Sequence, residues 1–239
     1  MAKRTVIETL VVELTTDNSK FRKGIKSLQQ SLTKTGQQMQ RIGRAITGFA
    51  VAAFTAIGMY ALKLTEEYDM AMNRVRAVTQ ATADDMNMLS ETAKYLGRTT
   101  ARTARDIASG METLGLAGFS TEEIQASISA VTSLSVISQQ TMAISAQNAA
   151  NIMSQFGISA EDLEVAVDQL AVTATSSNQT IEDLINGLKF AGPIANQAGL
   201  ELNEAAAAMG ILANNGIRAG IGGRALRMGI LKLIAPTGS

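Results

Sequence analysis

One turn occurs three times in the middle of the chain, and it constrains the fold more than any other feature. Each copy is a glycine, an apolar residue and a polar segment: Gly118–Ile124, Gly157–Leu163 and Gly199–Ala205. A glycine at such a position adopts the left-handed conformation that closes a helix, and the apolar residue can pack back on that helix. The copies are about 40 residues apart, a period typical of repeated helix pairs.

The residues after each glycine predict the start of the next helix. Ser120 and Ser159 are expected N-caps, with Glu123 and Asp162 completing capping boxes. In the third copy Asn203 is the expected cap. Further capping boxes are predicted at Thr82–Asp85, Thr103–Asp106 and Thr180–Asp183.

Other breaks fall between the three turns. Ser138–Gln140 and Ser176–Gln179 lie midway, and Gly97 and Gly216 extend the series, so helices are expected to end about every 20 residues. The helices between them have apolar faces at helical spacing. These faces are Ile124, Ile128, Val131 and Leu134; Leu163, Val167, Leu170 and Ala174; and Ile181, Leu184, Ile185 and Leu188. The pattern predicts an all-α fold with an array of short antiparallel helices; a generic helical bundle is the simpler alternative.

Composition argues against catalysis. The 239 residues include no histidine and no cysteine, which removes the commonest general base and the thiolate metal ligands. Glu123, Asp162 and Asp183 are better explained as capping partners than as catalytic acids. We therefore expect no enzyme activity, no cofactor and no metal site. Only 4% of residues are aromatic, so the core buries little area per residue, and we expect the chain to associate with copies of itself.

Charge is unevenly distributed although the net charge is zero. Residues 1–45 contain nine Lys and Arg against three Asp and Glu, whereas residues 106–215 contain one basic residue against twelve acidic ones. Residues 216–239 contain four basic residues and no acidic one. These segments could attract one another within one copy or between copies.

The N-terminal part divides into a short arm, residues 1–19, and a long basic helix, residues 20–67. Within the arm, residues 5–14 resemble a β-strand, which would either pair with another chain or be a frayed terminus. The helix has a heptad-spaced apolar seam that predicts self-association as a coiled coil; packing along the repeat region is the alternative. The proposed seam residues are Phe21, Ile25, Leu28, Leu32, Met39, Ile42, Ile46 and Phe49.

Residues 45–62 contain no charged residue. The stretch is slightly shorter than the ~20 residues of a membrane span, and the heptad seam continues through it. A buried or self-packing helix is the main interpretation, and a membrane-active segment is the alternative.

Two smaller features have weak functional interpretations. Arg98, Arg102 and Arg105 are spaced as on one helical face, which would bind phosphate, meet the acidic segment or be solvated. Gly220, Gly222 and Ala225 satisfy a loose GxGxxA pattern, but no strand precedes it, so no nucleotide or specific nucleic-acid site is predicted. The glycines are expected to form a flexible connection into a short basic helix that ends before Pro236.

From about residue 68 to 237, the order of several short segments resembles the conserved core of phage tail tape measure proteins. The segments are Ala71–Val78, Leu96–Thr99, Thr113–Ser120, Phe156–Asp162, Leu212–Ile217 and Gly223–Arg227. The helical core domain is therefore assigned to residues 68–239. Family members are usually much longer, so the resemblance implies that the core is truncated at its C-terminal end.

The resemblance implies a structural virion protein that templates tail tube length during assembly and is released with DNA ejection. It would lie inside the tail tube in the virion and in the host cytoplasm during assembly. Its implied partners are the tail tube protein, a tail assembly chaperone and tail tip or baseplate hub proteins, and the host membrane during ejection. Two alternatives remain open at this point: a membrane-active, pore-forming protein and a chemoreceptor-like signalling coiled coil.

Overall fold

The computed structural model describes Lys63 and residues 65–235. The strand-like arm at residues 1–19, the seam from Phe21 to Phe49 and the apolar stretch 45–62 lie outside the described residues. From Glu67 onward, the described residues belong to one compact unit.

All the regular secondary structure of the described residues is α-helical, which confirms the all-α prediction for these residues. Among the described residues, the first helix is formed by residues 65–79. Eight labelled helices follow: α3 (Ala83–Thr99), α4 (Ala104–Leu116), α5 (Thr121–Ile137), α6 (Met142–Phe156), α7 (Leu163–Thr175), α8 (Ile181–Gln197), α9 (Leu202–Asn214) and α10 (Ala219–Ile234).

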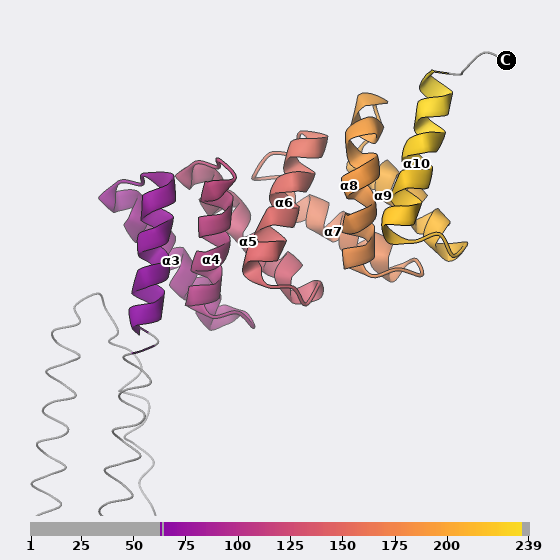
Figure 1. The fold of residues 1–239 in the computed structure, drawn as a ribbon. Coiled ribbons are helices and arrows are strands. Elements are labelled where there is room, and N and C mark those ends of the chain that lie inside the picture. Colours follow the sequence, from indigo (N-terminus) through magenta and orange to yellow (C-terminus); the bar gives the residue numbers. More distant parts are fainter. Residues whose placement is uncertain (1–62, 64, 236–239) are drawn as a thin grey trace, which may run out of the picture. The chain divides into compact units, whose positions relative to one another are not determined.

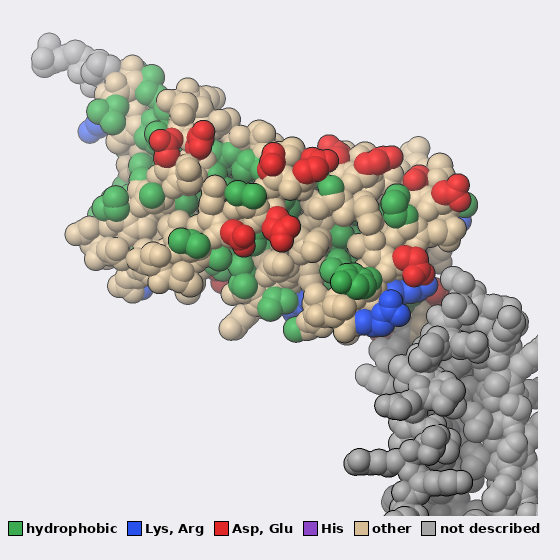
Figure 2. Space-filling view, turned by 180° about the vertical axis from the view of Figure 1, so that it is seen from behind, with side chains coloured by type: hydrophobic (Ala, Val, Ile, Leu, Met, Phe, Trp, Pro, Cys, Tyr) green, Lys and Arg blue, Asp and Glu red, His purple; other side chains and the backbone are tan. Residues whose placement is uncertain are grey.

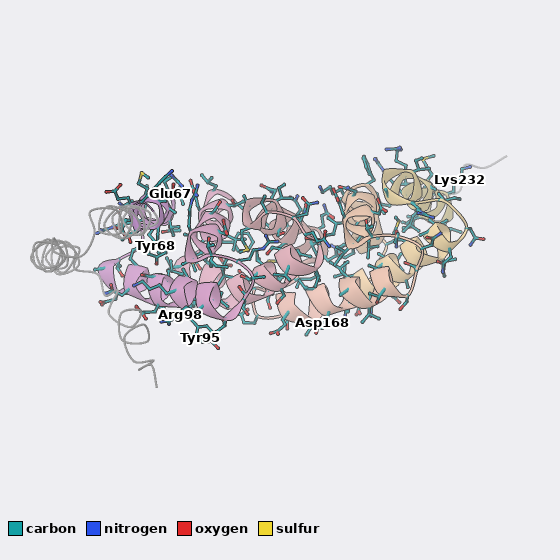
Figure 3. All side chains as sticks on the ribbon, turned by 90° about the horizontal axis from the view of Figure 1, so that it is seen from below. Glu67, Tyr68, Tyr95, Arg98, Asp168 and Lys232 are labelled. Carbon is teal, nitrogen blue, oxygen red and sulfur yellow. The ribbon has the colours of Figure 1, made fainter. Side chains whose placement is uncertain are left out.

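The helices of the compact unit form two layers. Helix 65–79, α4, α6, α8 and α10 make one layer, and α3, α5, α7 and α9 make the other (Figures 1 and 3). Each labelled helix makes its substantial contacts with helices one or two places away in the sequence. The unit is therefore a stack of helical hairpins, as the repeated turns predict.

The repeated turn has one hydrogen-bonding pattern at every copy. The glycines at 118, 157 and 199 have φ values of 92°, 66° and 81°, which only glycine adopts without strain. The apolar residue that follows donates its backbone N–H to a carbonyl five residues earlier, for example Ile158 to Met153 at 3.0 Å. This bond is the outer one of the Schellman motif. Gly216 and Ile217 repeat the same pattern after α9, as predicted.

The predicted capping boxes form at the starts of α3, α4, α5 and α8. Two other starts were predicted wrongly. Asn203 lies inside α9, whose N-cap is Glu201; the Glu204 carboxylate accepts from the Glu201 N–H at 2.9 Å. Ser159 accepts from the Asp162 N–H at 3.2 Å, but this bond closes a separate turn, and α7 begins only after it.

The apolar faces predicted from helical spacing are all turned into the core, with only Ala174 partly buried. Alanine and glycine fill much of the remaining interior, so helices approach closely. The glycines at such contacts correct two predictions. Gly97 does not end a helix but lies within α3, where an added Cβ would be 2.9 Å from the Ala104 Cα.

The glycines near the C-terminal end were also predicted wrongly. They are not a flexible connection, because α10 begins at Ala219 and includes them. Gly222 and Gly223 are buried, and a Cβ on Gly223 would overlap the Gly187 carbonyl of α8. Gly223 allows α10 to pack directly on the α8 backbone, and Gly222 packs against the Ile217 carbonyl and Met209 of α9. The helix does end before Pro236, as predicted.

Candidate protein-interaction surfaces

Arg102 connects two neighbouring hairpins. It lies in the link between α3 and α4, and its guanidinium donates to the Ser135 carbonyl and, at 2.8 Å, to the Gln140 carbonyl. Its Nε also donates to the Ser135 hydroxyl at 2.9 Å. These carbonyls lie at the end of α5 and just beyond it, where helices leave acceptors without intrahelical partners.

The three arginines do not share a face, so that prediction was wrong. Arg98 is in the last turn of α3, whereas Arg105 is in α4 and pairs with Glu67 at 2.8 Å. The sequence spacing was that of a helix, but the link between α3 and α4 interrupts the helix between these residues. No common phosphate-binding surface results.

The same edge of the stack contains further ties between consecutive links. Gln140 donates to the Glu182 carboxylate at 3.0 Å, which joins the α5–α6 link to the first turn of α8. The Asn178 N–H donates to the Asn214 amide oxygen at 2.8 Å, which joins the α7–α8 link to the end of α9. Each hairpin is thus fastened to the next by side chains at one edge.

Most carboxylates serve the helix starts. The first turns of α3, α5, α7 and α9 contain acidic residues, and a row of acidic side chains lies along one edge of the face that these helices form (Figure 2). A hydrogen bond to its own backbone N–H at the start of α5 lowers the pKa of Glu122, and the hydroxyls of Thr121 and Ser120 add to this effect. The described residues include no group of three or more acidic, His or Cys side chains placed to hold a metal ion.

Tyr68 also has a shifted pKa. Burial raises the pKa of its phenol, and the hydrogen bond to the Ser90 hydroxyl at 2.9 Å partly opposes that effect. Asp69 and Glu91 raise it further. The side chain joins helix 65–79 to α3, so its role is structural.

Helix α7 exposes an apolar stripe with a carboxylate in it. Val165 and Val172 are 58% and 64% exposed, and Asp168 lies between them on the same face. Together with Gln169, Thr173 and Asn203 of α9, they line a shallow hollow of about 350 Å³. A second hollow, about 420 Å³, lies between the turns that precede α7 and α9.

Helix α10 exposes a stripe of the opposite charge. Ile221 and Met228 are 65% and 54% exposed, and Arg224, Ala225 and Lys232 lie on the same side of the helix. The Arg224 guanidinium lies over the Phe190 ring of α8, 5.0 Å from its centroid. Helix α10 has no acidic residue.

Neither stripe was predicted from the sequence, because apolar spacing was used to find the core. The signal was present as an apolar residue, a charged residue three places later and an apolar residue seven places later in both helices. Only the structure distinguishes these outward apolar residues from those that face inward. None of the helices that the structure describes is long and apolar enough to span a membrane.

Two tape measure proteins are similar to this chain. The tape measure protein of Pneumococcus phage Dp-1 is 30% identical over 96% of the chain and 21% of its own length. The probable tape measure protein of Escherichia phage P2 is 27% identical over 90% of the chain and 26% of its own length. The chain thus spans about a fifth to a quarter of the length of these relatives.

No solved structure matches the chain. The sequence profile of the family described as phage-related minor tail protein matches residues 90–239, which covers α4 to α10 and part of α3. That range includes all three copies of the glycine turn and both exposed stripes. The match confirms the resemblance inferred from the short segments: the chain belongs to the family of phage-related minor tail proteins.

Proposed function

We propose that this chain is part of a tail tape measure protein, a structural component of a tailed phage. The observation that carries the proposal is the similarity to two tape measure proteins over nearly the whole chain. The hairpin stack supports a structural role. The described carboxylates mostly cap helices or lie exposed on the surface, so they are explained without catalysis. In this role the protein templates tail length and leaves the tail with the DNA, and it performs no catalysis.

The proposed location is the tail tube of the virion, after assembly in the host cytoplasm. The proposed partners are copies of the chain itself, the tail tube protein, a tail assembly chaperone and proteins of the tail tip or baseplate hub. Self-association through the seam from Phe21 to Phe49 and entry of residues 45–62 into the host membrane during ejection belong to the same proposal. A chemoreceptor-like role is not favoured, because turns interrupt the described helices about every 20 residues.

Electron microscopy of phage particles tests the tape measure role. An in-frame deletion of residues 83–234 removes the whole labelled stack without shifting the reading frame. We expect tails to be absent or to lose their uniform length, and complementation with the intact gene should restore them. Tails of unchanged number and length in the deletion phage would contradict the proposal.

Mass spectrometry of purified tails tests the location separately. Peptides from α5 and α8 should be present in intact tails and should be depleted from particles that have ejected their DNA. A chain detected only in the infected cell, and never in particles, would exclude the virion role even if the deletion phage lacked tails.

A further inference from the structure

We propose that the α10 stripe of one copy binds the α7 stripe of a second copy, so that the core units associate head to tail. The α7 stripe is Val165, Asp168 and Val172, and the α10 stripe is Ile221, Arg224 and Met228. This contact is additional to the seam proposed in the N-terminal part and does not depend on the tail role.

The two stripes match in spacing and are opposite in charge. Both have an apolar residue, a charged residue three places later and an apolar residue seven places later. Laid face to face, apolar side chains meet apolar side chains, and the carboxylate lies within reach of the guanidinium. The opposite charges favour contact between an α7 stripe and an α10 stripe. They disfavour contact between two identical stripes, whose like charges would repel.

The surface shape also fits. The α7 stripe borders the shallow hollow of about 350 Å³ between α7 and α9. The Met228 side chain is unbranched and that of Ile221 is narrow at its tip, so either can enter such a hollow. Both are more than half exposed in the single chain. Large exposed apolar side chains gathered on one helix face mark interaction surfaces.

Neither charged residue has an ion-pair partner within the described residues. Asp168 and Arg224 take part in none of the salt bridges of the compact unit, which join Arg74 to Glu112, Lys94 to Glu91 and Arg105 to Glu67. Phe190 supports the Arg224 guanidinium at the surface. Asp168 of α7 and Lys232 of α10 lie on different layers of the unit (Figure 3), so these stripes can meet only between copies.

The consequence is a directional association. Two different surfaces make a heterologous contact, which propagates from copy to copy unless the rotation closes a ring. The seam, by contrast, would join identical segments. The two contacts can therefore be measured independently in the full chain.

Cysteine crosslinking tests this contact directly, because the natural chain has no cysteine. Gln169→Cys and Ala225→Cys place one thiol near the centre of each stripe. At these central positions the two thiols meet whether the two helices lie parallel or antiparallel. We expect the oxidised equimolar mixture of these full-length variants to yield a mixed disulfide dimer, identified by mass spectrometry. The control mixture pairs Ala225→Cys with Tyr95→Cys, a position 59% exposed on α3 (Figure 3). The mixed dimer should exceed this control at least about fivefold.

Charge reversal provides the second arm. Asp168→Arg in the Gln169→Cys chain should lower the mixed dimer about tenfold, because Arg224 would then face a like charge. Adding Arg224→Asp to the Ala225→Cys chain should restore it. Met228→Lys removes an apolar side chain of the α10 stripe and keeps Arg224, so it should lower the mixed dimer, whereas Tyr95→Lys should not. Circular dichroism should show that all variants remain folded.

Each result decides the proposal. A mixed dimer no more abundant than the control, or one that charge reversal does not change, would overturn it. Failure to restore the dimer in the doubly reversed pair would show that Asp168 and Arg224 do not face each other and would also overturn it. If the cysteine variants form the mixed dimer but deletion of residues 83–234 leaves the tails unchanged, the contact between copies would be supported and the proposed function contradicted.

Discussion

Two glycines in the same helix should respond in opposite ways to the same substitution. Gly223 is buried against α8, whereas Gly229 is exposed and has no atom within 4 Å of the position that a Cβ would take. Replacing either by alanine improves helix propensity by up to about 1 kcal/mol. Only at Gly223 does the new methyl group meet another backbone.

The magnitude at Gly223 follows from what the methyl group would contact. Besides overlapping the Gly187 carbonyl oxygen, it would lie 2.7 Å from the Gly187 carbonyl carbon and 2.8 Å from its Cα. Backbone atoms cannot rotate away, so α10 has to move off α8 as a body. Overpacking of a core costs about 1–3 kcal/mol, and we take the upper end here because no side chain can yield. After the propensity gain, Gly223→Ala should destabilise the unit by about 2 kcal/mol.

Thermal unfolding and urea unfolding, both monitored by circular dichroism, measure both variants. For a domain of this size, 1 kcal/mol corresponds to a shift in Tm of about 2–4 °C. We expect Gly223→Ala to lower Tm by about 4–8 °C and Gly229→Ala to raise it by up to about 4 °C, with unchanged m-values. If Gly223→Ala were as stable as Gly229→Ala, the close packing of α10 on α8 would be refuted.

Three further variants test other parts of the molecule. Charged residues in place of Ile25, Leu32 and Ile42 should convert the chain to monomers at concentrations where the parent associates, as measured by analytical ultracentrifugation; an unchanged mass would contradict the proposed seam. Arg102→Met should lower the free energy of unfolding by about 1–3 kcal/mol, because the carbonyls at the end of α5 lose a charged donor, and a neutral result in urea titrations would mean that water replaces it fully. Burial raises the pKa of Tyr68, so the stability that the neutral phenol contributes should be present below pH 10 and fall as the pH rises above the unfolded value of about 10. Tyr68→Phe should therefore make the urea midpoints at pH 8 and pH 10.5 more nearly equal. Equal pH sensitivity of both proteins would argue against the buried phenol.

The local signals in the sequence were sufficient to predict the hairpin array. A glycine followed by an apolar residue and a capping box encodes a helix end and a helix start within seven residues, as at Gly118 and Ser120. Such signals act over one turn of chain, so the tertiary contacts do not override them. The predicted start failed at Asn203, where Glu201 and Glu204 form an equivalent cap from residue types that capping rules rank lower.

The role of the remaining glycines could not be read locally. Gly97 and Gly223 lie within helices, and each is small because another helix approaches it. Which helix approaches depends on the stacking of the hairpins, which spacing in one segment does not specify. Arg102 was misplaced for the same reason: its periodicity with Arg98 was helical, but the acceptors that hold it lie more than 30 residues away.

The exposed stripes could be predicted only in part. Apolar spacing predicted an apolar face for α7 and only a short basic helix for α10, and both helices carry apolar residues on two sides. Packing determines which side is buried: Leu170 of α7 and Ile230 of α10 face inward, whereas Val165 and Met228 face outward. A sequence pattern of this kind predicts two apolar surfaces on a helix but not which of them is buried.

The restriction of contacts to helices one or two places apart has a mechanical consequence. Because no strong contact joins α3 to α8 or α4 to α10, a pulling force at either end meets only the outermost hairpin and its ties, such as Asn178 to Asn214. The stack should therefore peel open one pair of rods at a time, at a series of small loads, and should re-form in the reverse order when the load is released.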